Sequence, residues 1–153
     1  MMGKIYFDLD GVLRSLTSAC GYDPQSWDEP CHGLPVYEYI NRNLGLLVSA
    51  PETEYCHLVA EKEITVLTVQ PLHWIPYTRF WIEDHLPLAT VKWCQHPSEK
   101  LEYMQEGDLL IEDYPLFSDY SKIIVIDRPY NRTVKPYKRV RTPEELKEIL
   151  EGR

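Results

Sequence analysis

The sequence predicts a doubly wound α/β fold with a mainly parallel, five-stranded sheet. Five short runs rich in β-branched and apolar residues recur along the chain, at 4–9, 64–69, 89–93, 108–112 and 122–126. Segments with helix signals separate most of these runs, and such alternation is typical of a parallel sheet with covering helices. Most runs are apolar almost throughout rather than at every second residue, which indicates strands buried on both faces.

Helix start and stop signals lie between and after the runs. The segment 78–86 carries several large apolar residues and stops before a proline. The segment 98–106 is expected to start at a Ser98 cap and to end at a glycine. Near the end of the chain, Thr142 precedes a proline and lies three residues before Glu145, which is a strong helix start. We therefore predict two crossover helices and a C-terminal helix.

The segment 13–63 interrupts this alternation. A crossover between parallel strands needs only about a dozen residues. Four prolines and two helical candidates, at 36–44 and 52–62, predict a small, mostly helical cap inserted after the first strand. The expected division is therefore an α/β core of residues 1–12 and 64–153 and a cap of residues 13–63. The cap carries eight acidic and three basic residues, an excess that we interpret as a solvated surface.

Composition and charge narrow the class of protein. Hydrophobic residues make up 44% and charged residues 26%, as in ordinary globular proteins. The net charge of −8 disfavours long-range attraction to nucleic acid or to an anionic membrane. No apolar run approaches the length of a membrane span, and the four cysteines are scattered without a CxxC pair. We expect a soluble, cytoplasmic protein with reduced thiols and no membrane partner.

Two carboxylates end the first predicted strand. Asp8 and Asp10 are two residues apart, so their side chains point the same way in an extended chain. Gly11 allows a sharp turn and a close approach of backbone to a ligand. Ligands of open α/β sheets bind at the carboxyl ends of strands, and paired carboxylates there suit an oxyanion substrate held through Mg²⁺. The alternatives are a surface turn and a calcium loop, but residues 14–16 lack the further acidic groups that a calcium loop needs.

The run Phe-Asp-Leu-Asp-Gly-Val at 7–12 resembles the first motif of the haloacid dehalogenase-like phosphatases. The resemblance implies that Asp8 is the nucleophile and forms an aspartyl-phosphate. It implies that Asp10 protonates the leaving oxygen and then activates the hydrolytic water. It also implies that the Asp8 carboxylate and the Asp10 backbone carbonyl bind Mg²⁺. These roles divide one displacement into two easier steps, while the metal neutralises charge on the phosphoryl group.

The same interpretation requires a hydroxyl and a lysine at other strand ends. Thr68, in the second predicted strand, fits the hydroxyl that would bond the phosphoryl oxygens. Lys100 is the best candidate for the lysine that would offset negative charge ahead of the fourth strand. Lys92 and Arg79 are its rivals.

An acidic pair ends the fourth predicted strand. Glu112 and Asp113 are adjacent, so their side chains cannot face the same way in a regular strand. We expect one of them to bind the metal and the other to support it indirectly, and we favour Asp113 as the ligand. Glu112 stands where relatives often have Asp. The candidate metal ligands are therefore Asp8, Asp10, Asp113 and Glu112.

A narrower resemblance points to the 5'(3')-deoxyribonucleotidases. Three stretches carry it: Gly-Asp-Leu-Leu-Ile-Glu-Asp-Tyr-Pro at 107–115, Pro-Tyr-Asn-Arg at 129–132 and Pro-Tyr-Thr-Arg-Phe-Trp at 76–81. The resemblance implies a nucleoside monophosphate substrate whose base is held by aromatic residues of the cap. The cap aromatics that could stack on a base are Tyr22, Trp27, Tyr37, Tyr39 and Tyr55.

The sequence leaves two other functions open. The first is a phosphatase for another small phosphate ester or for a nucleic-acid end, and the second is a non-catalytic binding module on the same fold. The segment 128–141 bears on the first, because it holds six basic residues and no acidic one. It could help to hold a phosphate near the site. We favour a solvated loop instead, and consider nucleic acid an unlikely partner.

Overall fold

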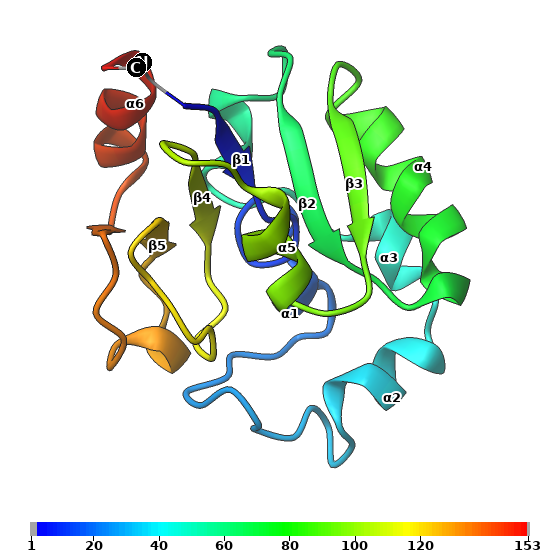
Figure 1. Ribbon diagram of the computed structural model, residues 1–153. Helices are drawn as coiled ribbons and strands as arrows, with labels where there is room; N and C mark the ends of the chain where they lie inside the picture. The colour runs from blue at the N-terminus through cyan, green and yellow to red at the C-terminus, as the bar shows by residue number, and fades with distance from the viewer. Residues whose placement is uncertain (1–2, 153) are drawn as a thin grey trace.

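Six parallel strands form one sheet, in the order β3-β2-β1-β4-β5-β6, in the computed structural model, which describes residues 3–152 (Figure 1). Every neighbouring pair is parallel. The α/β class and the parallel sheet are thereby confirmed. The strands are β1 (Ile5–Phe7), β2 (Thr65–Val69), β3 (Thr90–Cys94), β4 (Leu109–Glu112), β5 (Ile123–Ile126) and β6 (Lys138–Val140).

The expectation of five strands is wrong, because β6 forms inside the basic segment 128–141. Two of its three residues are charged, so the strand lacks the apolar signal of the others. Only Val140 is fully buried, as suits a short strand at the sheet edge. Arg139 is held by Asp127 at 2.9 Å and by the backbone carbonyls of Asn131 and Val134. The basic segment is therefore partly structural rather than a solvated loop.

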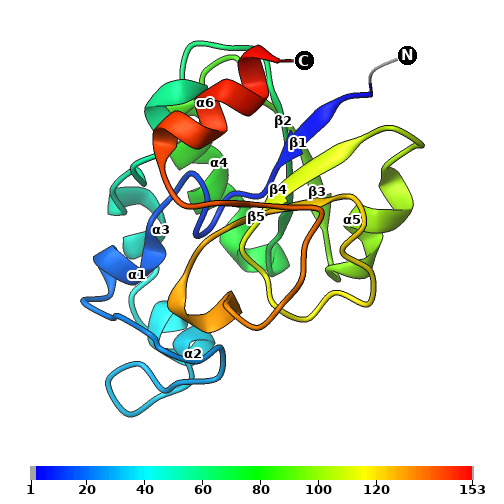
Figure 2. The ribbon, with the colours of Figure 1, turned by 90° about the vertical axis from the view of Figure 1, so that its left-hand side faces the viewer.

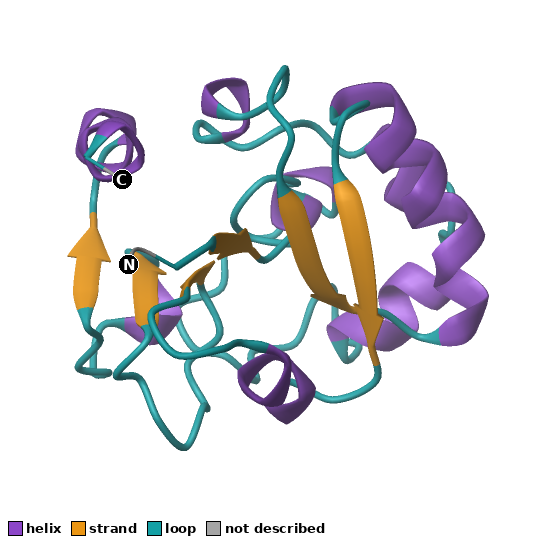
Figure 3. Cartoon of the chain, turned by 45° about the horizontal axis from the view of Figure 1, so that its top comes forward, coloured by secondary structure: helices purple, strands orange, loops and turns teal. Residues whose placement is uncertain are grey.

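Helices cover both faces of the sheet (Figure 3). Residues from α4 and α6 pack into the hydrophobic cluster on one face, and the end of α5 packs into the cluster on the other. No helix within residues 3–152 is both long enough and apolar enough to cross a membrane. The helices are α1 (Leu16–Ala19), α2 (Val36–Asn41), α3 (Leu46–Ser49), α4 (Ile75–His85), α5 (Ser98–Tyr103) and α6 (Pro143–Glu151), with 3-10 turns η1 (Cys56–Leu58), η2 (Leu72–Trp74) and η3 (Pro129–Asn131).

Two helix expectations need correction. A helix over 52–62 is wrong, because only η1 forms there. The Thr53 hydroxyl donates to the Val12 carbonyl and the Thr53 N–H donates to the Leu13 carbonyl, so this stretch follows the loop after β1. The Ser98 cap is also wrong: Ser98 is the first helical residue, and Pro97 precedes it without a side-chain cap.

Other helix ends follow their signals more closely. The Thr142 side chain accepts a hydrogen bond from the Glu145 N–H at 3.2 Å, which confirms the predicted cap of α6. Helix α4 starts earlier than expected, at Ile75, and its first turn accommodates a proline, since an N–H there would have no partner within the helix. Helix α5 ends at Tyr103, three residues before the expected end.

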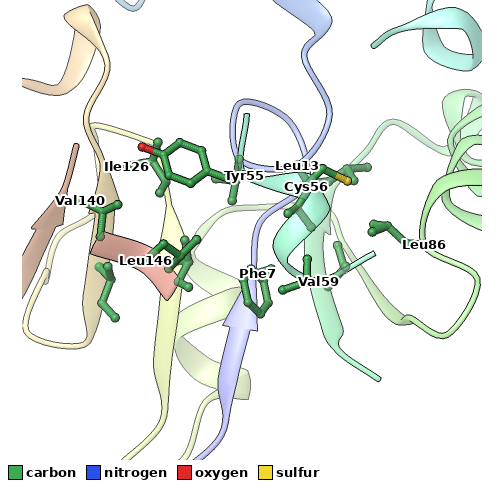
Figure 4. Close-up of a cluster of buried hydrophobic side chains, with 14 of the residues drawn as sticks. Phe7, Leu13, Tyr55, Cys56, Val59, Leu86, Ile126, Val140 and Leu146 are labelled. Carbon is green, nitrogen blue, oxygen red and sulfur yellow. The ribbon is translucent and has the colours of Figure 1, made fainter. Parts of the chain in front are cut away.

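The core is divided between the two faces of the sheet. Phe7, Ile111 and Ile124 point to one face, where Figure 4 shows Phe7 among side chains from the C-terminal helix and from residues 55–59. Tyr6 and Leu110 point to the other. Burial on both faces explains why these strands read as continuous apolar runs.

Much of the segment between β1 and β2 lies below the carboxyl ends of the strands (Figures 1 and 2). Part of it has its own small cluster, formed by Cys20, Cys31, Ile40 and Leu47 with Trp74. Further along, residues 55–59 instead pack on the sheet. Cysteines 20, 31, 56 and 94 are all free and buried.

Candidate functional site

Three buried carboxylates meet at the carboxyl ends of β1 and β4. Asp8 directly follows β1, Glu112 is the last residue of β4, and Asp113 follows it. The two strands are neighbours, so their ends bring together residues that lie far apart in the sequence. Each side chain offers an oxygen that lies within 4.8 Å of the others. Such a set of oxygen donors is the kind that hard divalent cations prefer.

Lys100 bridges two of these carboxylates. Its ammonium lies 2.8 Å from Asp8 Oδ1 and 2.7 Å from Glu112 Oε2, and only 3% of Lys100 is exposed. The lysine comes from α5, which lies beside the strand ends. Burial alone would lower the pKa of Lys100, but Asp8 and Glu112 outweigh burial and raise it above its ordinary value. Lys100 is therefore a fixed positive charge in the site.

The rivals of Lys100 lie elsewhere. Lys92 has its ammonium 5.8 Å from the ring centre of Tyr103, and Arg79 lies 5.6 Å from the ring centre of Trp93. Both pairs are cation–π contacts. Geometry thus selects Lys100 from the three candidates.

Burial makes Asp8 and Asp113 resist ionisation. Burial, followed by the charge of Glu112, raises the pKa of Asp8 well above its usual range, although Lys100 opposes the shift. Burial and the charge of Asp8 raise the pKa of Asp113 to about 8, against the opposing hydrogen bond from Tyr130. A cation placed among these groups would favour their ionised forms.

Glu112 and Asp113 differ in how they are held. Glu112 Oε1 accepts hydrogen bonds from the N–H groups of Asp113 and Tyr114, and its Oε2 faces Lys100. Asp113 instead accepts a hydrogen bond from the Tyr130 hydroxyl, and its backbone carbonyl accepts one from Asn131. Both oxygens of Glu112 are therefore engaged by the protein, which favours Asp113 as the metal ligand.

Gly11 fits the site closely. Its backbone φ angle of +87° is one that residues with a side chain rarely adopt. A Cβ at this position would lie 1.9 Å from Asp113 Oδ2, so no other residue fits beside that carboxylate. The Arg128 guanidinium donates to the Gly11 carbonyl at 2.9 Å, which holds this turn against the loop after β5.

Asp10 lies at the edge of the carboxylate cluster and is bound by groups that the sequence did not indicate. Arg14 donates from Nε and Nη2 to the two oxygens of Asp10, at 2.6 and 3.0 Å. Gln70 donates from Nε2 to Asp10 Oδ2 and to Thr68 Oγ1, both at 2.9 Å. The available signals were weak: Gln70 lies two residues after Thr68, and Arg14 four after Asp10.

A cavity of about 400 Å³ opens beside Asp10, Gly11 and Asp113. Five of its sixteen lining residues are aromatic. Trp27 packs on Tyr130 with ring centres 5.4 Å apart. All of its charged lining residues are acidic: Asp10, Asp28, Glu29 and Asp113.

The cavity divides the five cap aromatics into two groups. Tyr22, Trp27 and Tyr37 line it. Tyr55 is instead buried in the cluster on the sheet, and Tyr39 packs against His32 with ring centres 4.9 Å apart. A further aromatic, Trp74 from η2, also lines the cavity and stacks on Tyr37.

The structure thus places every residue of the expected site at or beside the carboxyl ends of the strands: Asp8, Asp10, Thr68, Lys100, Glu112 and Asp113. Four of them form the charged cluster, while Thr68 and Asp10 are linked through Gln70. Comparison with models of known families and with curated proteins finds no match for this chain.

Proposed function

We propose that this protein is a Mg²⁺-dependent phosphatase that hydrolyses phosphomonoesters through an aspartyl-phosphate on Asp8. The single observation that carries the proposal is the charge of the buried cluster. Three carboxylates within 4.8 Å and one ammonium leave two formal negative charges when all are ionised. A divalent cation would balance this charge, in place of the protons that the raised pKa values of Asp8 and Asp113 favour without it.

The residues present suit Mg²⁺. Carboxylates of Asp8 and Asp113 offer hard oxygen ligands, and the missing side chain of Gly11 lets the Asp113 carboxylate lie against the turn after β1. We assign the Asp10 backbone carbonyl as a further ligand, as the resemblance to haloacid dehalogenase-like phosphatases implies. When bound, the metal supplies charge neutralisation for the phosphoryl oxygens and for the attacking carboxylate.

The protein's own residues carry out the two displacements in this proposal. An Asp8 oxygen attacks phosphorus, the bond from phosphorus to the ester oxygen breaks, and Asp10 gives that oxygen a proton. Asp10 then takes a proton from a water molecule, which attacks phosphorus, releases phosphate and restores Asp8. Lys100 offsets the negative charge, and Thr68 donates a hydrogen bond to a phosphoryl oxygen.

The cavity supports a nucleoside monophosphate as the substrate. It begins beside Asp10, where the leaving oxygen would lie, and Tyr22, Trp27, Tyr37 and Trp74 could stack on a base. Its acidic residues would repel further phosphate groups, which disfavours a nucleic-acid end or a polyphosphate. Together with the sequence resemblance, the cavity leads us to propose that the enzyme is a 5'(3')-deoxyribonucleotidase.

A substrate panel tests this activity. We expect phosphate release from nucleoside monophosphates with Mg²⁺, and none when EDTA removes the metal. Faster release from sugar phosphates would move the assignment to another small phosphate ester. An absence of release from every ester, p-nitrophenyl phosphate included, would contradict the phosphatase and favour a binding module.

Substitutions at the acidic pair test the division of roles. Asp113→Asn should raise the Mg²⁺ concentration for half-maximal activity by about 10- to 100-fold, because it weakens a direct ligand. Glu112→Gln keeps the size of the side chain and should raise it less, since Glu112 is tied to Lys100 and to backbone N–H groups. Magnesium titrations of the two variants would reverse the assignment if Glu112→Gln had the larger effect.

A further inference from the structure

A closed ring of hydrogen bonds lies behind Asp10. Its other members, Arg14, Gln70 and Thr78, are 0%, 1% and 0% exposed. They come from the turn after β1, the end of β2 and helix α4. They bond to Asp10 or to one another from behind it, so they are placed to act through Asp10 rather than on a ligand.

The chemistry of the side chains fixes the direction of every bond in the ring. A guanidinium has no acceptor, so the Thr78 hydroxyl must accept from Arg14 Nη1, at 3.2 Å. Its one proton then goes to Gln70 Oε1, at 3.0 Å. The amide of Gln70 is thereby oriented with Nε2 toward Asp10.

The same orientation determines what Thr68 can do. Gln70 Nε2 donates its second proton to Thr68 Oγ1, at 2.9 Å. The Thr68 oxygen is therefore an acceptor on its Gln70 side, and the hydroxyl proton is left to be donated elsewhere. A phosphoryl oxygen accepts hydrogen bonds, so it needs a partner whose proton is free to be donated in this way.

Arg14 also ties the ring to the segment over the strand ends. Arg14 Nη1 donates to the Leu47 carbonyl at 2.9 Å, in α3. The guanidinium lies 5.7 Å from the ring centre of Trp81, which is fully buried in α4. The position of the guanidinium is thus set by two helices, α3 and α4, and its two bonds to Asp10 fix both carboxylate oxygens.

We propose that Arg14, Thr78 and Gln70 are positioning residues, which hold the Asp10 carboxylate and orient the Thr68 hydroxyl for phosphoryl transfer. The proposal rests on the phosphatase function proposed above. Gln70 has the central role, because its one amide group bonds both Asp10 and Thr68. Gln70→Glu would keep the size of the side chain while replacing its donors with acceptors opposite the Asp10 carboxylate.

Kinetics of matched variants test the ring. Gln70→Glu and Thr78→Val should lower kcat by about 10- to 100-fold, because a misplaced reacting group is costly. KM should change by less than about twofold, since neither residue touches the substrate. Thr78→Ser keeps the hydroxyl and should restore most of the rate. Ile82→Val, one turn further along α4 and also buried, is the control for core damage.

The leaving group gives a second kinetic readout. Proton donation by Asp10 matters more for an alkyl phosphate than for p-nitrophenyl phosphate, whose leaving oxygen needs less help. The loss in Gln70→Glu should therefore be larger for the alkyl ester. An unchanged kcat in Gln70→Glu and Thr78→Val would overturn the proposal, as would equal losses in Thr78→Ser and Thr78→Val.

A measurement that does not depend on catalysis distinguishes this proposal from the phosphatase function on which it rests. In ¹H–¹⁵N spectra, the side-chain amide of Gln70, identified by its loss in Gln70→Glu, should exchange slowly with solvent. It should exchange faster in Thr78→Val and stay slow in Thr78→Ser. Fast exchange in the wild-type protein would refute the ring even if phosphatase activity is found. Slow exchange in an inactive protein would refute the function and leave the ring standing.

Discussion

Asp8→Asn is expected to lower turnover by on the order of 10³-fold or more, because the amide cannot act as the nucleophile. The substitution keeps the size of the side chain, and Lys100 keeps Glu112 as its partner. The fold should therefore survive, which circular dichroism and thermal unfolding would check. Initial rates of phosphate release from the best substrate of the panel measure the effect.

Asp108→Asn is the matched control for Asp8→Asn. Asp108 is also buried beside β4, but it precedes the strand and lies at the opposite edge of the sheet. Its carboxylate accepts hydrogen bonds from the N–H groups of Lys4 and Gln105, both at 2.8 Å. This variant should lose some stability and keep its turnover. An active Asp8→Asn protein would contradict the covalent mechanism.

Lys100→Met is expected to destabilise the metal-free protein by about 3–5 kcal/mol, because removing one partner of a buried ion pair leaves the other charge uncompensated. Here two carboxylates lose their partner, those of Asp8 and Glu112. Methionine keeps much of the aliphatic stem, so the loss reports mainly on charge. Chemical denaturation in EDTA measures it.

Lys92→Met serves as the comparison for Lys100→Met. Lys92 lies in β3, is exposed and faces the Tyr103 ring rather than a carboxylate. Its replacement should change the free energy of unfolding by less than about 1 kcal/mol. Equal effects of the two substitutions would show that Lys100 has no special electrostatic role.

The sequence predicted the parts of the site that follow from strand order. Asp8 and Asp113 each directly follow an apolar strand, and parallel strands bring their carboxyl ends to one edge. Lys100 could be proposed from its place in the chain, but its choice over Lys92 needed three-dimensional geometry. Its contact with Asp8 spans 92 residues.

The supporting groups could not be predicted in this way. Gln70 and Arg14 look ordinary in sequence. Their roles depend on distant contacts, because Arg14 bonds Thr78, 64 positions away, and Gln70 bonds Asp10, 60 positions away. The strand β6 has no apolar signal in the sequence, because two of its three residues are charged. The absence of a helix over 52–62 reflects bonds to the turn after β1, a tertiary effect that local propensity does not record.

In the proposed mechanism, Asp8 receives a phosphoryl group with the help of Mg²⁺. Beryllium fluoride tests it directly, because this tetrahedral mimic bonds to a reactive carboxylate and needs no knowledge of the substrate. We predict a bound ¹⁹F resonance with the wild-type protein and Mg²⁺, which disappears with EDTA and in Asp8→Asn. A spectrum without a bound signal in the wild-type protein, or a signal that persists in Asp8→Asn, would contradict the account.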